Sequence, residues 1–168
     1  MQMLIARMTS RRSMVRILES IALLLLAGGL GARVPLDRNL QSDPWLKSQV
    51  IQPADLAKEL GQGGKREIVC VGFDDSYRNV HIAGATYYGP ASKPPVLEDL
   101  KKWARNVPRG EQITLYCGCC PMDQCPNIRP AFQALKEMGF TNLRILSIPT
   151  DFRKDWVDKG FPVEKAGR

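Results

Sequence analysis

Four cysteines gathered in one short stretch are the residues of this sequence best suited to chemistry. Cys117, Cys119, Cys120 and Cys125 lie within nine consecutive residues, and the fifth cysteine, Cys70, stands apart. Disulfides that hold a small fold join distant segments, whereas these four residues could close only very small loops. The spacing therefore predicts local thiol chemistry, in which a thiolate acts as a nucleophile, as a partner in disulfide exchange or as a metal ligand.

The segments around the cysteines alternate between strand-like and helix-like patterns. Continuous apolar runs predict central strands at Glu67 to Phe73 and Gln112 to Cys117, and a further strand at Asn142 to Ile148. Apolar residues three and four apart predict helices at Pro53 to Leu60, Val96 to Ala104 and Ile128 to Met138. This alternation is typical of an α/β domain with a parallel sheet.

Cys117 therefore comes at the carboxyl end of a strand, and the other three thiols lead into a helix. Open α/β sheets place their ligands at this edge. We expect the amide groups at the helix amino terminus to favour the thiolate of Cys117 and to lower its pKa. Asn127 is the expected N-cap, with Pro130 in the first turn and the Arg129 N–H as the donor to the cap.

Several segments, in the same order, resemble the rhodanese-like sulfurtransferases. They are QPADLAKEL, SYRNVHIAGA (Ser76 to Ala85), ITLYC, ALKEMGFTNLRIL and DWVDKGFPVE (Asp155 to Glu164). The resemblance implies a three-layer α/β fold with a five-stranded parallel sheet flanked by helices. It also implies that Cys117, which follows the strand directly, takes sulfane sulfur from a small anionic donor such as thiosulfate as a persulfide and passes it to a thiol acceptor.

The sequence departs from that family around the cysteines. Eleven residues separate Cys117 from Arg129, so the loop is longer than usual, and loop length governs which donor fits. Cys70 and Gly72 stand where the family carries an acidic residue and an arginine, and Ser76 replaces its usual glutamate. We expect Arg129 and Asn127 to bind the donor. His81, the only histidine, is expected to be structural, and Cys70 to lie in the core.

The three additional thiols leave rival functions open. Cys119, Cys120 and Cys125 could resolve a persulfide as a disulfide, relay sulfur or join Cys117 in binding a metal, with copper(I) the first ion to test. The rivals to a sulfurtransferase are thus a thiol-disulfide redox protein that uses Cys117 and Cys120, and a metal-binding or non-catalytic rhodanese-like module. No cofactor is expected for the sulfurtransferase.

The chain begins with the pattern of an export signal. Within residues 1–32, RMTSRRSMVR is basic and ILESIALLLLAGGLGA is apolar, and the segment Ser10 to Arg16 resembles a twin-arginine signal; an ordinary Sec signal is the alternative. We expect a linker at 33–47 and the rhodanese-like domain at 48–166. The protein would then be periplasmic or secreted, and free of the membrane unless the signal is retained as an anchor.

The charge of the chain gives no sign of a nucleic-acid partner. The formal net charge is +7, and removal of residues 1–32 would take away four arginines and one glutamate and leave +4. The remaining lysines and arginines are scattered among acidic residues rather than gathered in a run. A small anionic substrate is compatible with this mild excess.

Overall fold

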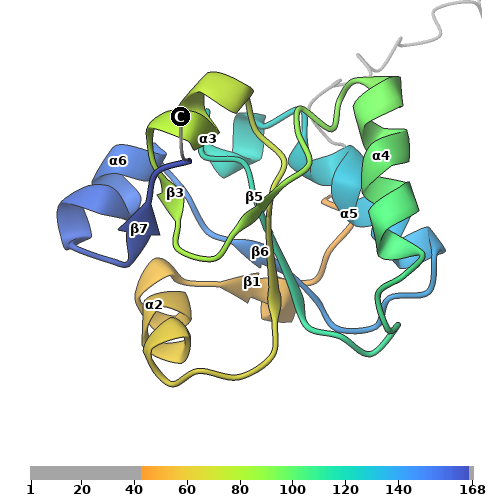
Figure 1. Ribbon diagram of the computed structural model, residues 1–168, viewed down its shortest axis with the longest axis horizontal. Coiled ribbons are helices and arrows are strands. Elements are labelled where there is room, and N and C mark those ends of the chain that lie inside the picture. The colour runs from red at the N-terminus through yellow and green to blue at the C-terminus, as the bar shows by residue number, and fades with distance from the viewer. Residues whose placement is uncertain (1–42, 167–168) are drawn as a thin grey trace, which may run out of the picture. The chain divides into compact units, whose positions relative to one another are not determined.

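The centre of the fold is a five-stranded sheet in which every neighbouring pair of strands is parallel. The structure is a computed structural model that describes residues 43–166. The strand order is β1-β6-β5-β2-β4 (Figure 1). The strands are β1 (Val50–Ile51), β2 (Glu67–Cys70), β4 (Thr86–Tyr87), β5 (Ile113–Tyr116) and β6 (Leu143–Leu146). The predicted parallel sheet is confirmed, and its middle strand is β5, which directly precedes Cys117.

Helices cover both faces of this sheet, as predicted. One face carries α4 (Pro94–Ala104) and α5 (Ile128–Glu137), and the other carries α2 (Pro53–Gly61) and α6 (Phe152–Asp155) (Figure 1). Both α2 and α4 begin with proline, whose fixed φ suits a first helical turn. The remaining elements are α3 (Asp74–Asn79), the antiparallel pair β3 (His81–Ile82) and β7 (Val163–Glu164), and the 3₁₀ turns η1 (Lys47–Gln49), η2 (Met122–Gln124) and η3 (Val157–Lys159).

The sheet divides the hydrophobic core into two halves. All four residues of β5 are buried, as expected of a strand covered on both faces. Ile113 and Leu115 contribute to the half beneath α4 and α5, whereas Tyr116 contributes to the half that contains Phe152 and Trp156. This alternation is the period of two that a strand imposes on its side chains. Strand β5 is thus held rigidly from both sides up to the residue before Cys117.

The predicted strands are longer than the observed ones, most clearly for the strand expected at Glu67 to Phe73. The strand expected to reach Phe73 ends at Cys70, although the Val71 N–H still donates to the Tyr116 carbonyl at 2.8 Å. Near the carboxyl end of the domain, α6 ends after four residues, because Trp156 leaves helical geometry at φ −128°. Both aromatic side chains are nevertheless buried.

The amino-terminal predictions meet the structure only in part. The export signal and most of the linker lie outside the described residues. Trp45, at the end of the predicted linker, is 8% exposed and packs edge-on against Phe132 of α5, with 5.5 Å between ring centroids. The domain boundary at residue 48 stays a prediction, but packing already begins before it. Among residues 43–166 there is no helix with the length and apolar character to cross a membrane.

Candidate functional site

The cysteine loop, residues 117–127, connects the carboxyl end of β5 to the amino end of α5. Gly118 has a φ of +73°, the left-handed region that favours glycine, and this turn brings Cys119 back beside Cys117. Farther along, the Met122 N–H donates to the Ile148 carbonyl at 2.9 Å, which fastens the loop to the segment after β6. The backbone therefore sets the positions of the thiols.

All four loop sulfurs gather in one cluster, which we call the thiol cluster (Cys117, Cys119, Cys120 and Cys125). Their Sγ atoms all lie within 4.8 Å of one another. The Sγ atoms of Cys117 and Cys119 are 2.7 Å apart, and those of Cys119 and Cys120 are 3.5 Å apart. Cys117 and Cys125 are buried, whereas Cys119 and Cys120 are partly exposed. A solute therefore meets Cys119 and Cys120 first.

Gly72 lets the strand neighbouring β5 approach the start of the loop. A Cβ atom at Gly72 would clash with the carbonyl of Cys117, and one at Gly89 would clash with the backbone of Val71 and Gly72. Cys70, which is 2% exposed and lies in the core as predicted, directs its thiol toward the same Cys117 carbonyl at 3.7 Å. This role of Gly72 was not predicted from the sequence, although a glycine in or next to a strand can mark a close backbone approach.

Asn127 joins the thiol cluster to the segment before α4. Its side chain is fully buried, and Nδ2 donates toward the Sγ atoms of Cys117 at 3.6 Å and Cys119 at 4.0 Å. Its Oδ1 accepts a hydrogen bond of 3.0 Å from the Ser92 N–H. The residue occupies the N-cap position of α5, but the prediction that its side chain caps the helix is wrong. The carboxamide instead binds the Ser92 N–H and the sulfurs. The backbone of Asn127 is also already helical, at φ −95° and ψ −35°, whereas a capping residue usually has an extended backbone.

Negative charge in the thiol cluster is stabilised on Cys125 rather than on Cys117. Hydrogen bonds from the Cys117 and Cys119 thiols, and then from the backbone N–H groups of Asn127 and Ile128, hold the pKa of Cys125 far below its usual range. Hydrogen bonding to Cys119 and Cys125, together with burial, raises the pKa of Cys117. The expectation that the helix amino terminus lowers the pKa of Cys117 is therefore wrong, because that terminus acts on Cys125.

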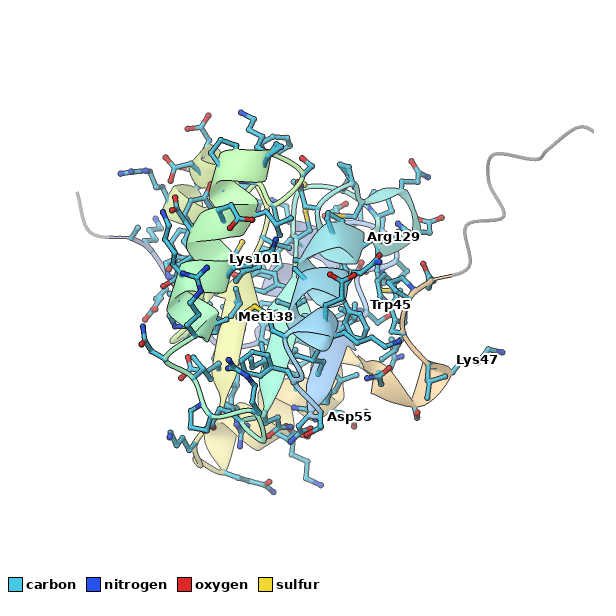
Figure 2. All side chains as sticks on the ribbon, turned by 90° about the vertical axis from the view of Figure 1, so that its right-hand side faces the viewer. Trp45, Lys47, Asp55, Lys101, Arg129 and Met138 are labelled. Carbon is cyan, nitrogen blue, oxygen red and sulfur yellow. The ribbon has the colours of Figure 1, made fainter. Side chains whose placement is uncertain are left out.

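Arg129, expected to bind the donor, makes contacts on the outer side of α5. Its guanidinium lies 2.6 Å from Asp43 Oδ1 and donates to the carbonyls of Cys125 at 3.2 Å and Asp123 at 3.0 Å. It also lies 5.6 Å from the ring centroid of Trp45, and Figure 2 shows the two side chains next to each other. These contacts brace the loop from outside, and donor binding by Arg129 remains a prediction.

His81 has contacts that account for it structurally, as the sequence analysis expected. Its Nδ1 lies 2.8 Å from the Tyr77 carbonyl oxygen, and its Nε2 lies 3.2 Å from Glu164 Oε1. The ring also stacks on Tyr77 with 3.9 Å between centroids. The Nδ1 contact thus joins β3 to α3, and the Nε2 contact joins β3 to β7.

Comparison with known proteins identifies relatives in structure rather than in sequence. The sequence matches no protein-family model and no curated protein. The solution structure of the rhodanese-like domain of the Anabaena sp. Alr3790 protein is 18% identical with a TM-score of 0.51, and covers 70% of this chain and 79% of that chain. The BH2092 protein of Bacillus halodurans is 19% identical with a TM-score of 0.55, and covers 70% of this chain and 77% of that chain.

A third similar structure is that of an enzyme with a named activity. The anaerobic ergothioneine biosynthesis enzyme from Chlorobium limicola, in complex with trimethyl histidine, is 22% identical with a TM-score of 0.53. The match covers 70% of this chain but only 28% of the enzyme. A structure of a substituted EanB, also 22% identical with a TM-score of 0.52, contains ergothioneine covalently linked with a cysteine persulfide, and the match covers 70% of this chain and 28% of that chain. At these sequence identities the matches show a similar fold and nothing beyond it.

Proposed function

We propose, from the rhodanese-like fold of this chain, that it is a sulfurtransferase in which Cys117 carries sulfane sulfur as a persulfide. The observation that carries the proposal is the position of Cys117, directly after the central strand β5 and 2.7 Å from a second, partly exposed thiol, that of Cys119. The similar structures support sulfur chemistry at the level of the fold, because one of them, a substituted EanB, contains a cysteine persulfide. A fold alone does not fix a reaction, so the thiols have to carry the argument.

In the loading step, the Cys117 thiolate attacks the sulfane sulfur of the donor. The new S–S bond forms as the bond between that sulfur and the rest of the donor breaks, and the donor's remaining fragment leaves with the electron pair. With thiosulfate the products are the Cys117 persulfide anion and sulfite. The Cys117 proton is first lost to solvent, and Asn127 Nδ2, 3.6 Å from the sulfur, donates toward the thiolate that remains.

In the transfer step, sulfur moves outward through Cys119. The Cys119 thiolate attacks the terminal sulfur of the Cys117 persulfide, so that the persulfide is now on Cys119 and Cys117 leaves as a thiolate. An external thiolate then attacks the same sulfur and departs as a persulfide, and Cys119 is released as a thiolate. This order follows the exposure of the thiols, because Cys117 is 2% exposed whereas Cys119 is only partly buried. Asn127 Nδ2 donates toward both sulfurs and stabilises the charge on each in turn.

Intact mass spectrometry of the reduced protein tests this proposal. After incubation with thiosulfate or a polysulfide, the wild-type protein should gain the mass of one sulfur atom, and Cys117→Ala should gain none. Cys119→Ser should still gain sulfur but lose it to an added thiol at least tenfold more slowly. Loading of Cys117→Ala at the wild-type level would overturn the assignment of Cys117.

The same spectra test a thiol-disulfide function. The 2.7 Å contact favours a disulfide between Cys117 and Cys119, rather than the pair of Cys117 and Cys120 considered from the sequence. A mild oxidant that removes two hydrogens, with no sulfur gained from any donor, would replace the sulfurtransferase by a redox protein.

We also propose that the protein acts outside the cytoplasm, exported by its twin-arginine-like segment. In a bacterial host, joint replacement of Arg11 and Arg12 by lysine should leave the protein in the cytoplasmic fraction, because the export receptor reads that pair. Arg7→Lys, outside the pair, should leave export unchanged. Export of the doubly substituted protein at the wild-type level would point to the ordinary Sec signal instead.

A further inference from the structure

The thiol cluster has the dimensions of a metal site. A tetrahedral metal ion with metal–sulfur bonds of about 2.3 Å holds its sulfur ligands about 3.8 Å apart. In this protein the sulfur separations run from 2.7 Å to at most 4.8 Å, so they bracket that distance. Side-chain shifts of about 1 Å or less per sulfur would enclose an ion without moving the strand or the helix.

The donor set favours a thiophilic ion. Each of the four ligand atoms is a sulfur, and His81, the only histidine of the chain, is held by Tyr77 and Glu164. Soft thiolates select copper(I) and zinc and disfavour calcium and magnesium, which prefer oxygen. The compact spacing lacks the two separated cysteine pairs typical of structural zinc sites, so copper(I), the softer ion, is expected to bind more tightly.

The surroundings of the cluster can stabilise the charge of several thiolates. Asn127, which is fully buried, aims its Nδ2 group at the sulfurs of Cys117 and Cys119. Cys125 precedes α5 closely, where the positive end of the helix dipole lies. Hydrogen bonds of this kind to ligand atoms orient metal ligands and tune the ion they hold.

We propose that Cys117, Cys119, Cys120 and Cys125 bind one copper(I) ion per chain, and that the copper-bound protein does not transfer sulfur. Copper binding stands on the cluster alone, whereas the inhibition rests on the proposed function. In the bound form the lone pairs of Cys117 and Cys119 are engaged by the metal, so neither sulfur can attack a donor. Copper would thus switch the site between a carrier of metal and a carrier of sulfur.

The test uses the reduced full-length chain in the absence of oxygen. Copper(I) is added as its acetonitrile complex in one arm and zinc chloride in another, and metal is counted by mass spectrometry after desalting. We expect one copper per chain with thiolate-to-copper absorption in the near ultraviolet, and zinc retained at least tenfold more weakly. Copper added before thiosulfate should suppress sulfur gain, and a copper chelator should restore it.

Single substitutions separate this inference from the proposed function. Cys120 and Cys125 are proposed copper ligands, but neither acts as a nucleophile in the sulfur-transfer steps. Cys125→Ser and Cys120→Ser should therefore each weaken copper retention at least tenfold, while Cys117 still gains sulfur. Cys70→Ala, outside the cluster, should retain copper as the wild type does. Failure of the wild type to retain copper, or retention in both serine variants equal to the wild type, would overturn the inference. Copper retention by a wild type that never gains sulfur would instead overturn the sulfurtransferase.

Discussion

Asn127 is the residue on which the packing and the chemistry of the loop both depend. It is buried, it accepts from the Ser92 N–H, and it donates toward two sulfurs of the thiol cluster. A buried amide that satisfies backbone and thiols together is costly to replace, because each partner is left without its hydrogen bond.

Asn127→Ala should lower the free energy of unfolding by about 1–2 kcal/mol and slow sulfur loading of Cys117 several-fold, since one hydrogen bond is worth about 1 kcal/mol. Urea denaturation and intact mass spectrometry measure the two effects. Ser92→Ala keeps the N–H that Asn127 binds and should behave as the wild type. A stable Asn127→Ala protein that loads sulfur at the normal rate would show that the amide has neither role.

Burial of Cys70 should make the folded protein less stable at alkaline pH. Burial raises its pKa to about 11 in the folded protein. The thiol ionises near pH 8.5 once the chain is unfolded, so its contribution to stability is complete below that pH and is lost as the pH rises toward about 11. In urea denaturation at a series of pH values, the free energy of unfolding should fall by about 2–3 kcal/mol more in the wild type than in Cys70→Ala. Parallel curves for the two proteins would contradict this role.

At the scale of elements, the loop depends on a strand that ends abruptly and on one left-handed turn. Strand β5 is buried on both faces and stops at Tyr116, and Gly118 then reverses the chain. The cluster therefore forms only if the backbone takes this turn. Gly139, at φ +88° just after α5, has the same conformational demand far along the chain from the cysteines.

Gly118→Ala and Gly139→Ala form a matched pair. Each places a side chain at positive φ and should cost about 1–2 kcal/mol of stability. Only Gly118→Ala should also slow sulfur loading, at least tenfold, because displacement of reacting atoms by about 1 Å is costly. Thermal unfolding measures the first effect and mass spectrometry the second. Equal loading in the two variants would show that the turn does not place the sulfurs.

The elements themselves were largely predictable, and the contacts within the loop were not. Apolar runs and helical spacing located β2, β5, β6, α2, α4 and α5, because burial on a sheet or helix leaves a periodic pattern. The hydrogen bond between Asn127 and Ser92 joins residues 35 positions apart. No local sequence pattern indicates this contact. For the same reason, the helix amino terminus was expected to lower the pKa of Cys117, although it lowers that of Cys125.

At the scale of the whole molecule, the sheet separates two core halves, and the thiol cluster adjoins the half beneath α4 and α5. The same half includes Trp45, from the region expected to be a linker. The prolines and polar residues of this region predict a linker. That Trp45 belongs to the core becomes evident only from its contact with Phe132 of α5.

Trp45→Ala should lower the free energy of unfolding by about 3 kcal/mol, because it empties a space against Phe132 and removes the ring beside Arg129. Leu46→Ala is the control: Leu46 is 69% exposed, and its truncation should change stability by no more than about 0.5 kcal/mol. Urea denaturation compares the two variants. Similar small losses would mean that the folded unit begins after residue 46.

The unequal burial of the five sulfurs means that chemical counting of cysteines depends on the size of the reagent. Bulky maleimides should label only Cys119 and Cys120 in the native protein, and every cysteine after denaturation. A native titration would therefore undercount the thiols, and the gap between the two counts would report how much of the protein is folded.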